Sequence, residues 1–139
     1  MDVYNDGAPV RATQRVWSMS TRRKLIVVVD DDPMMLKSVQ RLLSANGFDT
    51  EAFASAEALL DCSPGGEPAC FVLDIHLGGM SGIDLRRRLT AAGSTVPVIF
   101  MTAFDDEATR QEAVAAGCVA YLQKPFPAAS LIGAIAKTG

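Results

Sequence analysis

An uninterrupted apolar run, Leu25–Val29, leads directly into three consecutive aspartates, Asp30, Asp31 and Asp32. A strand without polar positions has to be buried on both faces, which predicts a parallel sheet covered by helices on its two sides. The aspartates, by contrast, need a positive partner, because burying a carboxylate without one is costly in free energy. A divalent cation with oxygen ligands would be such a partner, so this run constrains both the fold and the chemistry.

Later apolar runs also end in polar side chains that can act together. The run beginning at Phe71 ends in Asp74, and two further runs end in Thr102 and, nearly, in Lys124. In open parallel sheets, ligands bind outside the carboxyl ends of the strands. We therefore expect an acidic pair, an aspartate, a hydroxyl and an amine to gather at one edge of the sheet.

Strand and helix patterns alternate from residue 24 onward, with capping residues where the helices begin and glycine or proline where several of them end. This alternation predicts five βα units, which form a doubly wound α/β fold with five parallel strands. The expected strands span 25–30, 48–53, 69–74, 96–102 and 119–123, and the expected helices span 33–45, 56–60, 83–92, 106–116 and 128–137.

The composition limits the class of protein. With 139 residues, of which 49% are apolar and 21% charged, the chain suits one globular domain. Its net charge of −3 gives no general attraction to nucleic acid, and its apolar runs are too short for membrane insertion. The start of the chain lacks the basic and apolar segments of a signal peptide, so we expect a cytoplasmic protein.

Residues 1–22 differ from the rest of the chain. They mix glycine, proline, asparagine and scattered arginine without a helical or strand period. We expect a flexible N-terminal extension there, with a short helix near residues 11–19, followed by a single domain at 23–139.

Two further groups of residues are interpreted as structural. The arginine run that starts at Arg86 is expected to form a solvated helix face, with a partner contact as the second interpretation. Cys62, Cys70 and Cys118 are odd in number and lack paired metal spacing. We interpret them as buried or half-buried thiols.

The residues at the strand ends suit phosphoryl transfer. Asp30, Asp31 and Asp74 could hold one Mg²⁺ and leave positions for water or substrate oxygens. An aspartate can also be the nucleophile and form an aspartyl-phosphate. Lys124 could neutralise a phosphoryl oxygen as a point charge, and Thr102 could donate its hydroxyl to another.

The chain from residue 24 to residue 137 resembles the receiver domain of bacterial two-component response regulators. Each of its motifs is weak alone, but five of them in order at this spacing are specific. This resemblance implies a flavodoxin-like fold with the strand order 2-1-3-4-5. The motifs are Val28-Val29-Asp30-Asp31-Asp32-Pro33, Val72-Leu73-Asp74-Ile75-His76-Leu77, Met80-Ser81-Gly82, Ile99-Phe100-Met101-Thr102-Ala103 and Lys124-Pro125-Phe126.

The resemblance also implies roles for the acidic residues. Asp74 is similar to the phosphoacceptor of the family, and Asp31 is similar to its direct metal ligand. Asp30 would support the metal through water, and the backbone carbonyl of His76 would complete the protein ligands. The implied cofactor is Mg²⁺, which Mn²⁺ could replace.

Further roles follow from the same resemblance. Thr102 is similar to the switch hydroxyl that turns toward the phosphoryl group, and Lys124 is similar to the phosphate-binding lysine. The Lys124–Pro125 peptide bond is expected to be cis, because X-Pro is the one bond where that form is cheap. Tyr121 matches the aromatic switch residue, although a half-buried core tyrosine is an equal alternative.

The chain departs from the family pattern near the site. Many receivers have proline four residues after the phosphoacceptor, where this chain has Gly78, and this loop should be less constrained. His76 and Phe104 occupy two flanking positions that vary across the family and affect the access of water. Asp32 is expected to cap the first helix and not to bind the metal.

The function implied by the resemblance is that of a phosphoacceptor switch in a two-component system or phosphorelay. Its partners would be a sensor histidine kinase or histidine phosphotransfer protein and an unidentified downstream protein. A phosphorylation-linked homodimer is a further expectation. Such a domain catalyses its own phosphorylation and dephosphorylation and is not a separate enzyme.

Three other functions compete with this one. A Mg²⁺-dependent phosphatase of the aspartyl-phosphate kind would want a second aspartate two residues after the nucleophile, where this chain has His76. An interaction module without phosphorylation would not need the complete set of site residues. A flavin-binding protein is poorly supported, because the aspartates after the first strand would repel a phosphate.

Overall fold

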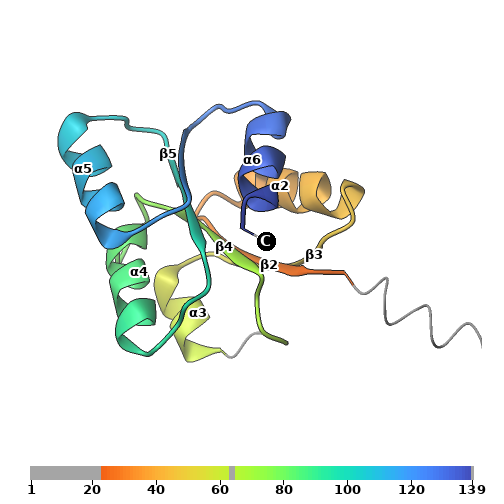
Figure 1. Cartoon of the computed structure of the whole chain (residues 1–139), viewed down its shortest axis with the longest axis horizontal. Coiled ribbons are helices and arrows are strands. Elements are labelled where there is room, and N and C mark those ends of the chain that lie inside the picture. Colours follow the sequence, from red (N-terminus) through yellow and green to blue (C-terminus); the bar gives the residue numbers. More distant parts are fainter. Residues whose placement is uncertain (1–22, 63–64, 139) are drawn as a thin grey trace, which may run out of the picture.

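The computed structural model describes residues 23–62 and 65–138. The predicted extension at 1–22 and the short helix expected near 11–19 lie outside the described residues. Within them, strands and helices alternate as the sequence predicts (Figure 1). The elements are β2 (Leu25–Val29), α2 (Pro33–Ala45), β3 (Asp49–Phe53), α3 (Ala56–Asp61), β4 (Cys70–Asp74), α4 (Gly82–Ala91), β5 (Val98–Thr102), α5 (Glu107–Ala116), β6 (Ala120–Gln123) and α6 (Ala128–Ala136).

The sheet has five strands in the order β3-β2-β4-β5-β6, and every neighbouring pair is parallel. In chain order this is 2-1-3-4-5, so the predicted flavodoxin-like fold is confirmed. The strand order reverses at β2, because β3 lies on one side of it and β4 on the other. The crevice between the carboxyl ends of β2 and β4 is therefore the expected ligand site.

Helices cover both faces of the sheet. Helices α2 and α6 lie on one face, and α3, α4 and α5 lie on the other (Figure 1). The central strands β4 and β5 are buried along their whole length, whereas the edge strands β3 and β6 are only half-buried. This difference explains why the central strands have continuous apolar runs and the edge strands have mixed sequences.

Side-chain caps fix where most of the helices begin. The carboxylate of Asp32 accepts a hydrogen bond from the Met34 N–H at 3.0 Å, so its predicted capping role is confirmed. Ser55 and Asp106 cap α3 and α5 in the same way. The turn after α5 uses Gly117 with a φ of 89°, a left-handed conformation that favours glycine.

The arginine run on α4 differs in part from its interpretation. Arg87 is exposed, but Arg86 is half-buried and its guanidinium donates to two backbone carbonyls. Its Nε lies 3.1 Å from the oxygen of Gly117, and its Nη1 lies 3.1 Å from the oxygen of Val96. Arg86 therefore joins two loops. Its guanidinium group has several N–H donors, so it can bind carbonyls of two segments that lie outside the strands.

The cysteines also differ in part from their interpretation. Cys70 is buried and Cys118 is half-buried, as expected, but Cys62 is exposed. Cys62 follows the last turn of the short helix α3, where the chain leaves the core.

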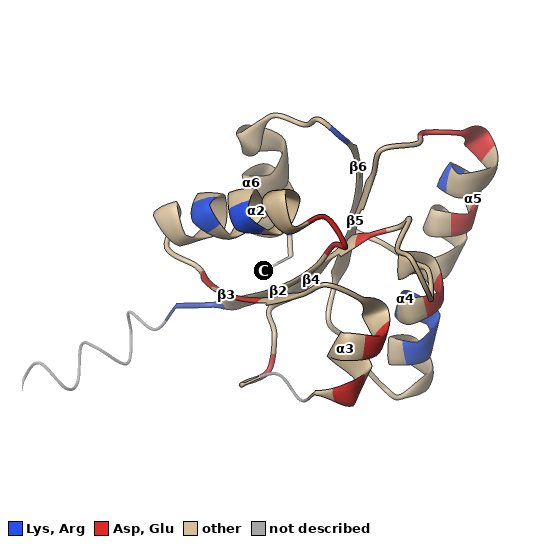
Figure 2. Cartoon of the chain, turned by 180° about the vertical axis from the view of Figure 1, so that it is seen from behind, with Lys and Arg blue, Asp and Glu red and all other residues tan. Residues whose placement is uncertain are grey.

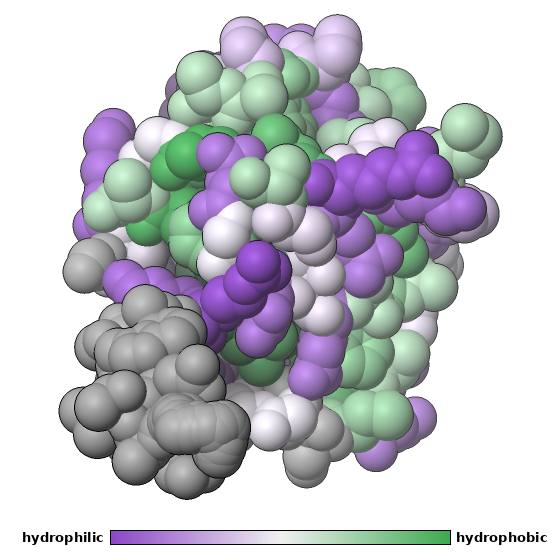
Figure 3. Space-filling view, turned by 90° about the vertical axis from the view of Figure 1, so that its right-hand side faces the viewer, coloured by the Kyte–Doolittle hydropathy of each residue, from purple (hydrophilic) through white to green (hydrophobic). Residues whose placement is uncertain are grey.

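Exposed apolar side chains are scattered over the surface. On the described part of the face in Figure 3, apolar side chains are interrupted by polar ones. Among the described residues, no helix has the length and apolar character needed to cross a membrane. The large apolar side chains that are exposed in the described part of the chain include Met34, Phe104, Val114, Leu60 and Val119.

We expect the substitution Leu43→Ala to lower the free energy of unfolding by about 2–5 kcal/mol, because it leaves a cavity in the core beneath α2. Leu43 is fully buried, whereas Leu60 is 39% exposed. The matched control Leu60→Ala should cost less than about 1 kcal/mol. Urea unfolding followed by circular dichroism measures both, and equal losses would contradict this description of the core.

Candidate functional site

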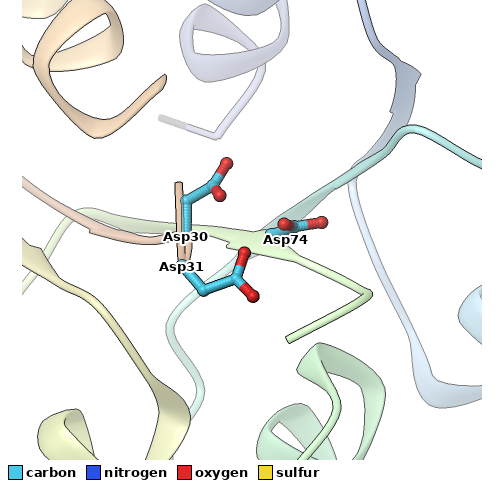
Figure 4. Close-up of side chains that lie close together, drawn as sticks. All are labelled: Asp30, Asp31 and Asp74. Atoms are coloured by element: carbon cyan, nitrogen blue, oxygen red, sulfur yellow. The ribbon is translucent and has the colours of Figure 1, made fainter. Parts of the chain in front are cut away.

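Three carboxylates meet at the carboxyl edge of the sheet. Asp30 and Asp31 follow β2 and Asp74 ends β4, and one oxygen of each lies within 4.8 Å of the others (Figure 4). Asp30 is fully buried and Asp74 is 4% exposed, whereas Asp31 is exposed. Figure 2 shows the acidic segment between β2 and α2 beside the end of β4. The gathering of these groups that the sequence predicts is confirmed.

Backbone hydrogen bonds fix the two buried carboxylates. The Asp30 side chain accepts from the N–H of Asp32 at 2.9 Å, which ties it to the start of α2. The Asp74 side chain accepts from the N–H of His76 at 3.3 Å. Each carboxylate is thus oriented by the chain that follows its own strand.

Lys124, which directly follows the edge strand β6, brings a positive charge to these carboxylates. Its Nζ lies 2.7 Å from Asp30 Oδ2 and 3.3 Å from Asp74 Oδ2. The backbone N–H of Lys124 donates to the oxygen of Thr102 at 2.7 Å, and the Lys124–Pro125 peptide bond is cis. The lysine therefore joins the end of β6 to the ends of β2 and β4.

The site carries more negative than positive charge. Burial and then the nearby charge of Asp30 raise the pKa of Asp74 to about 6, although Lys124 acts in the opposite direction. Burial lowers the pKa of Lys124, but its hydrogen bond to Asp30 and the charge of Asp74 outweigh this and raise the pKa overall. The pKa of Asp74 is raised although an ammonium group lies beside it, which indicates that one lysine does not offset burial together with the neighbouring carboxylate.

The donor set fits a hard divalent cation. Three carboxylates within reach of one another supply the oxygen ligands that Mg²⁺ binds in proteins, and the exposed Asp31 leaves an open side for water or substrate. The raised pKa of Asp74 adds a physical reason, because a cation would stabilise the ionised form. The ligand role of the His76 carbonyl stays a prediction.

Thr102 is buried at the end of β5, and its hydroxyl is engaged away from the carboxylates. The Oγ1 atom lies 2.9 Å from the oxygen of Phe104 and 3.0 Å from its nitrogen. It also lies 3.1 Å from Nδ1 of His76. Among the described residues, no hydrogen bond joins this hydroxyl to Asp74.

Tyr121 lies on β6 and is half-buried. The guanidinium carbon of Arg110 lies 4.8 Å from the centre of its ring, and Arg110 also pairs with Asp105 at 2.7 Å. The buried Tyr121 hydroxyl has no hydrogen-bond partner among the residues that the structure describes. The switch role of Tyr121 stays a prediction.

The loop between β4 and α4 is held close to Asp74. A Cβ atom on Gly82 would collide with the carbonyl oxygen of Asp74 and would lie 2.9 Å from its carbonyl carbon. Two residues earlier, the Met80 N–H donates to Glu57 at 2.9 Å, and this bond is the main cause that lowers the pKa of Glu57. The loop is thus fixed at both Met80 and Gly82.

Sequence reasoning missed several of these contacts. It named Gly82 in a motif, but no residue pattern shows how closely this glycine approaches Asp74. The contacts of Glu57, Arg110 and the His76 ring join segments far apart in the chain. Periodicity reports the faces of helices and strands, so it carries no signal for such pairs.

The raised pKa of Asp74 predicts how stability depends on pH. The unfolded chain releases this proton near pH 4, whereas the folded chain keeps it until about pH 6, so Asp74 destabilises the fold increasingly as pH rises through this window. We expect Asp74→Asn to raise the free energy of unfolding by on the order of 2 kcal/mol above about pH 7, and by little below about pH 4.

Urea unfolding with a chelator present, repeated across this pH range, measures the difference. The exposed residue Asp49 provides a matched control, because Asp49→Asn should change stability little at any pH. A gain for Asp74→Asn that does not vary with pH would contradict the assigned cause.

The close approach of Gly82 predicts a second effect on stability. We expect Gly82→Ala to destabilise the fold by about 1–3 kcal/mol, because the added methyl group displaces the backbone of Asp74. A methyl group added to Gly133 on α6 would have nothing within 4 Å of it, so Gly133→Ala should stabilise by up to about 1 kcal/mol. Thermal unfolding compares the two, and equal signs would contradict the geometry.

Comparison with known proteins agrees with this geometry. Residues 26–136 match the family model of the response regulator receiver domain. The response regulator protein TodT of Pseudomonas putida is 34% identical over 117 residues, which are 84% of this chain and 52% of TodT. The transcriptional regulatory protein FixJ of Bradyrhizobium diazoefficiens is 39% identical over 106 residues, which are 76% of this chain and 52% of FixJ. The chain thus spans about half the length of these relatives.

A solved structure is similar as well. The BeF3-activated receiver domain of DrrB, a protein of Thermotoga maritima, matches with a TM-score of 0.76 and 26% identity, covering 84% of this chain and 97% of that one. The family model covers most of the chain, and the sheet order agrees with it. The chain therefore belongs to the family of response regulator receiver domains of two-component systems.

Proposed function

We propose that Asp74 accepts a phosphoryl group in a Mg²⁺-dependent reaction and that this modification switches a partner-binding surface. The observation that carries the proposal is a buried aspartate at a strand end with an ammonium group 3.3 Å from one of its oxygens and two further carboxylates beside it. This arrangement provides a nucleophile, a positive charge for a phosphoryl oxygen and ligands for a cation. In-line phosphoryl transfer needs chiefly these functions.

In the proposed reaction, an oxygen of ionised Asp74 forms a bond to the phosphorus of a phosphohistidine. The phosphorus–nitrogen bond breaks, and its electron pair returns to the histidine of the donor. Lys124 turns from Asp74 to the transferred phosphoryl group, and its bond to Asp30 keeps its Nζ at the site. Mg²⁺ bound by Asp30, Asp31 and Asp74 would neutralise the remaining charge of the phosphoryl oxygens.

The site is open to solvent on the side of Asp31, whose side chain is exposed. A pocket of about 470 Å³ opens beside Asp31, and its lining includes His76, Gly78 and residues of α5. The donor proposed is a sensor histidine kinase or a histidine phosphotransfer protein in the cytoplasm. The receiver domain would comprise residues 23–139, with residues 1–22 as an extension.

The proposed signal is a shift between two conformations. The Thr102 hydroxyl would leave its present partners for a phosphoryl oxygen, and the ring of Tyr121 would follow. The surface near α5 and α6 would then bind a downstream protein or a second copy of the chain. FixJ is by name a transcriptional regulator, and this chain spans about half of its length.

A phosphatase acting on small substrates is less well supported. Such a reaction needs an acid two residues after the nucleophile to protonate the leaving group. That residue is His76, whose Nδ1 lies 3.1 Å from Thr102 Oγ1. The receiver function is therefore preferred, and dephosphorylation is proposed to be the domain's own reaction.

Phosphorylation can be tested on the purified chain with Mg²⁺ and acetyl phosphate as the donor. We expect intact-mass spectrometry to detect one phosphoryl adduct that requires Mg²⁺ and is lost in Asp74→Ala.

The substitution Lys124→Arg tests the geometry of the positive charge. We expect it to slow adduct formation about tenfold or more, because a planar guanidinium group replaces the compact ammonium group.

The matched control is Lys137→Arg, because Lys137 is exposed at the end of α6 and does not make the contacts with Asp30 and Asp74 that Lys124 makes. It should form the adduct at the rate of the unmodified chain. An adduct that persists in Asp74→Ala would overturn the assignment of the phosphoacceptor. A chain that does not bind beryllofluoride in the presence of Mg²⁺ would contradict the receiver function.

A further inference from the structure

The hydroxyl of Thr102 has three contacts, and they account for all of its hydrogen-bonding capacity. A hydroxyl has one proton to donate and two lone pairs that can accept. The backbone N–H of Phe104 must donate to Oγ1, because an N–H group can only be a donor. The oxygen of Phe104 must accept, so the hydroxyl proton is directed to it.

The third contact, with His76, then has only one consistent arrangement. Since the hydroxyl proton is used, the ring must donate from Nδ1 to Oγ1 across the 3.1 Å distance. If the hydroxyl instead donated to Nδ1, the 2.9 Å approach to the Phe104 oxygen would lack a proton. All three contacts are satisfied only when Nδ1 of His76 carries a hydrogen.

The exposed His76 ring also contacts a second ring. It meets the Phe104 ring edge to face, with ring centres 5.3 Å apart and planes at 81°. Phe104 thus contributes both its backbone, to the hydroxyl, and its ring, to the histidine. We call this group of His76, Thr102 and Phe104 the Thr102 latch.

The latch is joined directly to Asp74. The backbone N–H of His76 donates to the Asp74 carboxylate, while its ring contacts Thr102. A phosphoryl group on Asp74 would replace the carboxylate that this N–H now contacts. His76 therefore contacts both Asp74, the proposed phosphoacceptor, and the Thr102 hydroxyl, which would donate to a phosphoryl oxygen.

We propose that the His76 side chain is a positioning residue that holds the Thr102 hydroxyl in the unphosphorylated conformation. The inference rests on the proposed function, because it assigns a regulatory role within the same site. Thr102 can donate to a phosphoryl oxygen only after its proton leaves the Phe104 oxygen, and the bond from His76 opposes that movement. His76 thereby lowers the population of the conformation that binds a phosphoryl group.

The contact itself can be tested without phosphorylation. His76 is the only histidine in the sequence, so the imidazole nitrogen signals of an untagged, ¹⁵N-labelled chain belong to it alone. For the neutral ring, we expect the hydrogen on Nδ1 in the unmodified chain and on Nε2 in Thr102→Val, which removes the acceptor. A ring protonated on Nε2 in both chains would overturn the latch.

The role of the latch is tested by titration with beryllofluoride in the presence of Mg²⁺, followed by backbone NMR. His76→Phe keeps a ring for the packing with Phe104 but removes the donor, and we expect it to bind beryllofluoride about threefold more tightly, the effect of one partly exposed hydrogen bond. His76→Asn can donate from nearly the position of Nδ1 and should restore most of the original affinity.

The outcomes separate the latch from the proposed function. If the unmodified chain binds beryllofluoride but His76→Phe binds it equally or more weakly, the latch is overturned and the receiver function stands. If His76→Phe and His76→Asn bind equally tightly, the effect arises from packing and the assigned hydrogen bond is wrong. If the unmodified chain binds no beryllofluoride, the proposed function fails and the role of the latch fails with it.

Discussion

The ion pair between Lys124 and two buried aspartates is the interaction on which the rest of this structure depends. Asp30 follows β2 and Asp74 ends the neighbouring strand β4, and both are buried at the carboxyl edge of the sheet, where an unbalanced carboxylate would be costly. The ammonium group of Lys124 lies 2.7 Å from an oxygen of Asp30 and 3.3 Å from an oxygen of Asp74. It therefore lowers the free-energy cost of burying both carboxylates. The compensation is incomplete, as the raised pKa of Asp74 indicates, and the remaining negative charge is the physical basis of the proposed cation site and of the proposed nucleophile.

The topology explains why these groups meet. Parallel strands place all their carboxyl ends at one edge, and the reversal of strand order between β3 and β4 opens a crevice there. The helices on the two faces bury the strands without covering that edge. Loops that leave the same edge carry His76 and Phe104 beside the charged residues at or just after the strand ends.

Much of this architecture could be predicted from the sequence. Apolar runs that end in Asp30, Asp74 and Thr102 predict both the strands and the edge at which their last residues meet. Prediction reaches its limit with side chains whose partners lie in another loop. Arg86 was expected to be solvated, yet it donates to two carbonyls, because local sequence gives no information about distant backbone groups that lack partners. The contact between His76 and Thr102 joins residues 26 positions apart, and only the folded chain brings them together.

The fixed ends of the loop after β4 have a mechanical consequence. Gly82 packs against the backbone of Asp74, and Met80 is bonded to Glu57 on α3, so the last part of this loop moves only with the elements on either side of it. Adaptation of the loop is left to the stretch from His76 to Gly79, which includes two adjacent glycines. A loop anchored at its far end in this way would confine a disturbance at Asp74 to the side of the site that faces Thr102 and would keep it from spreading into α4.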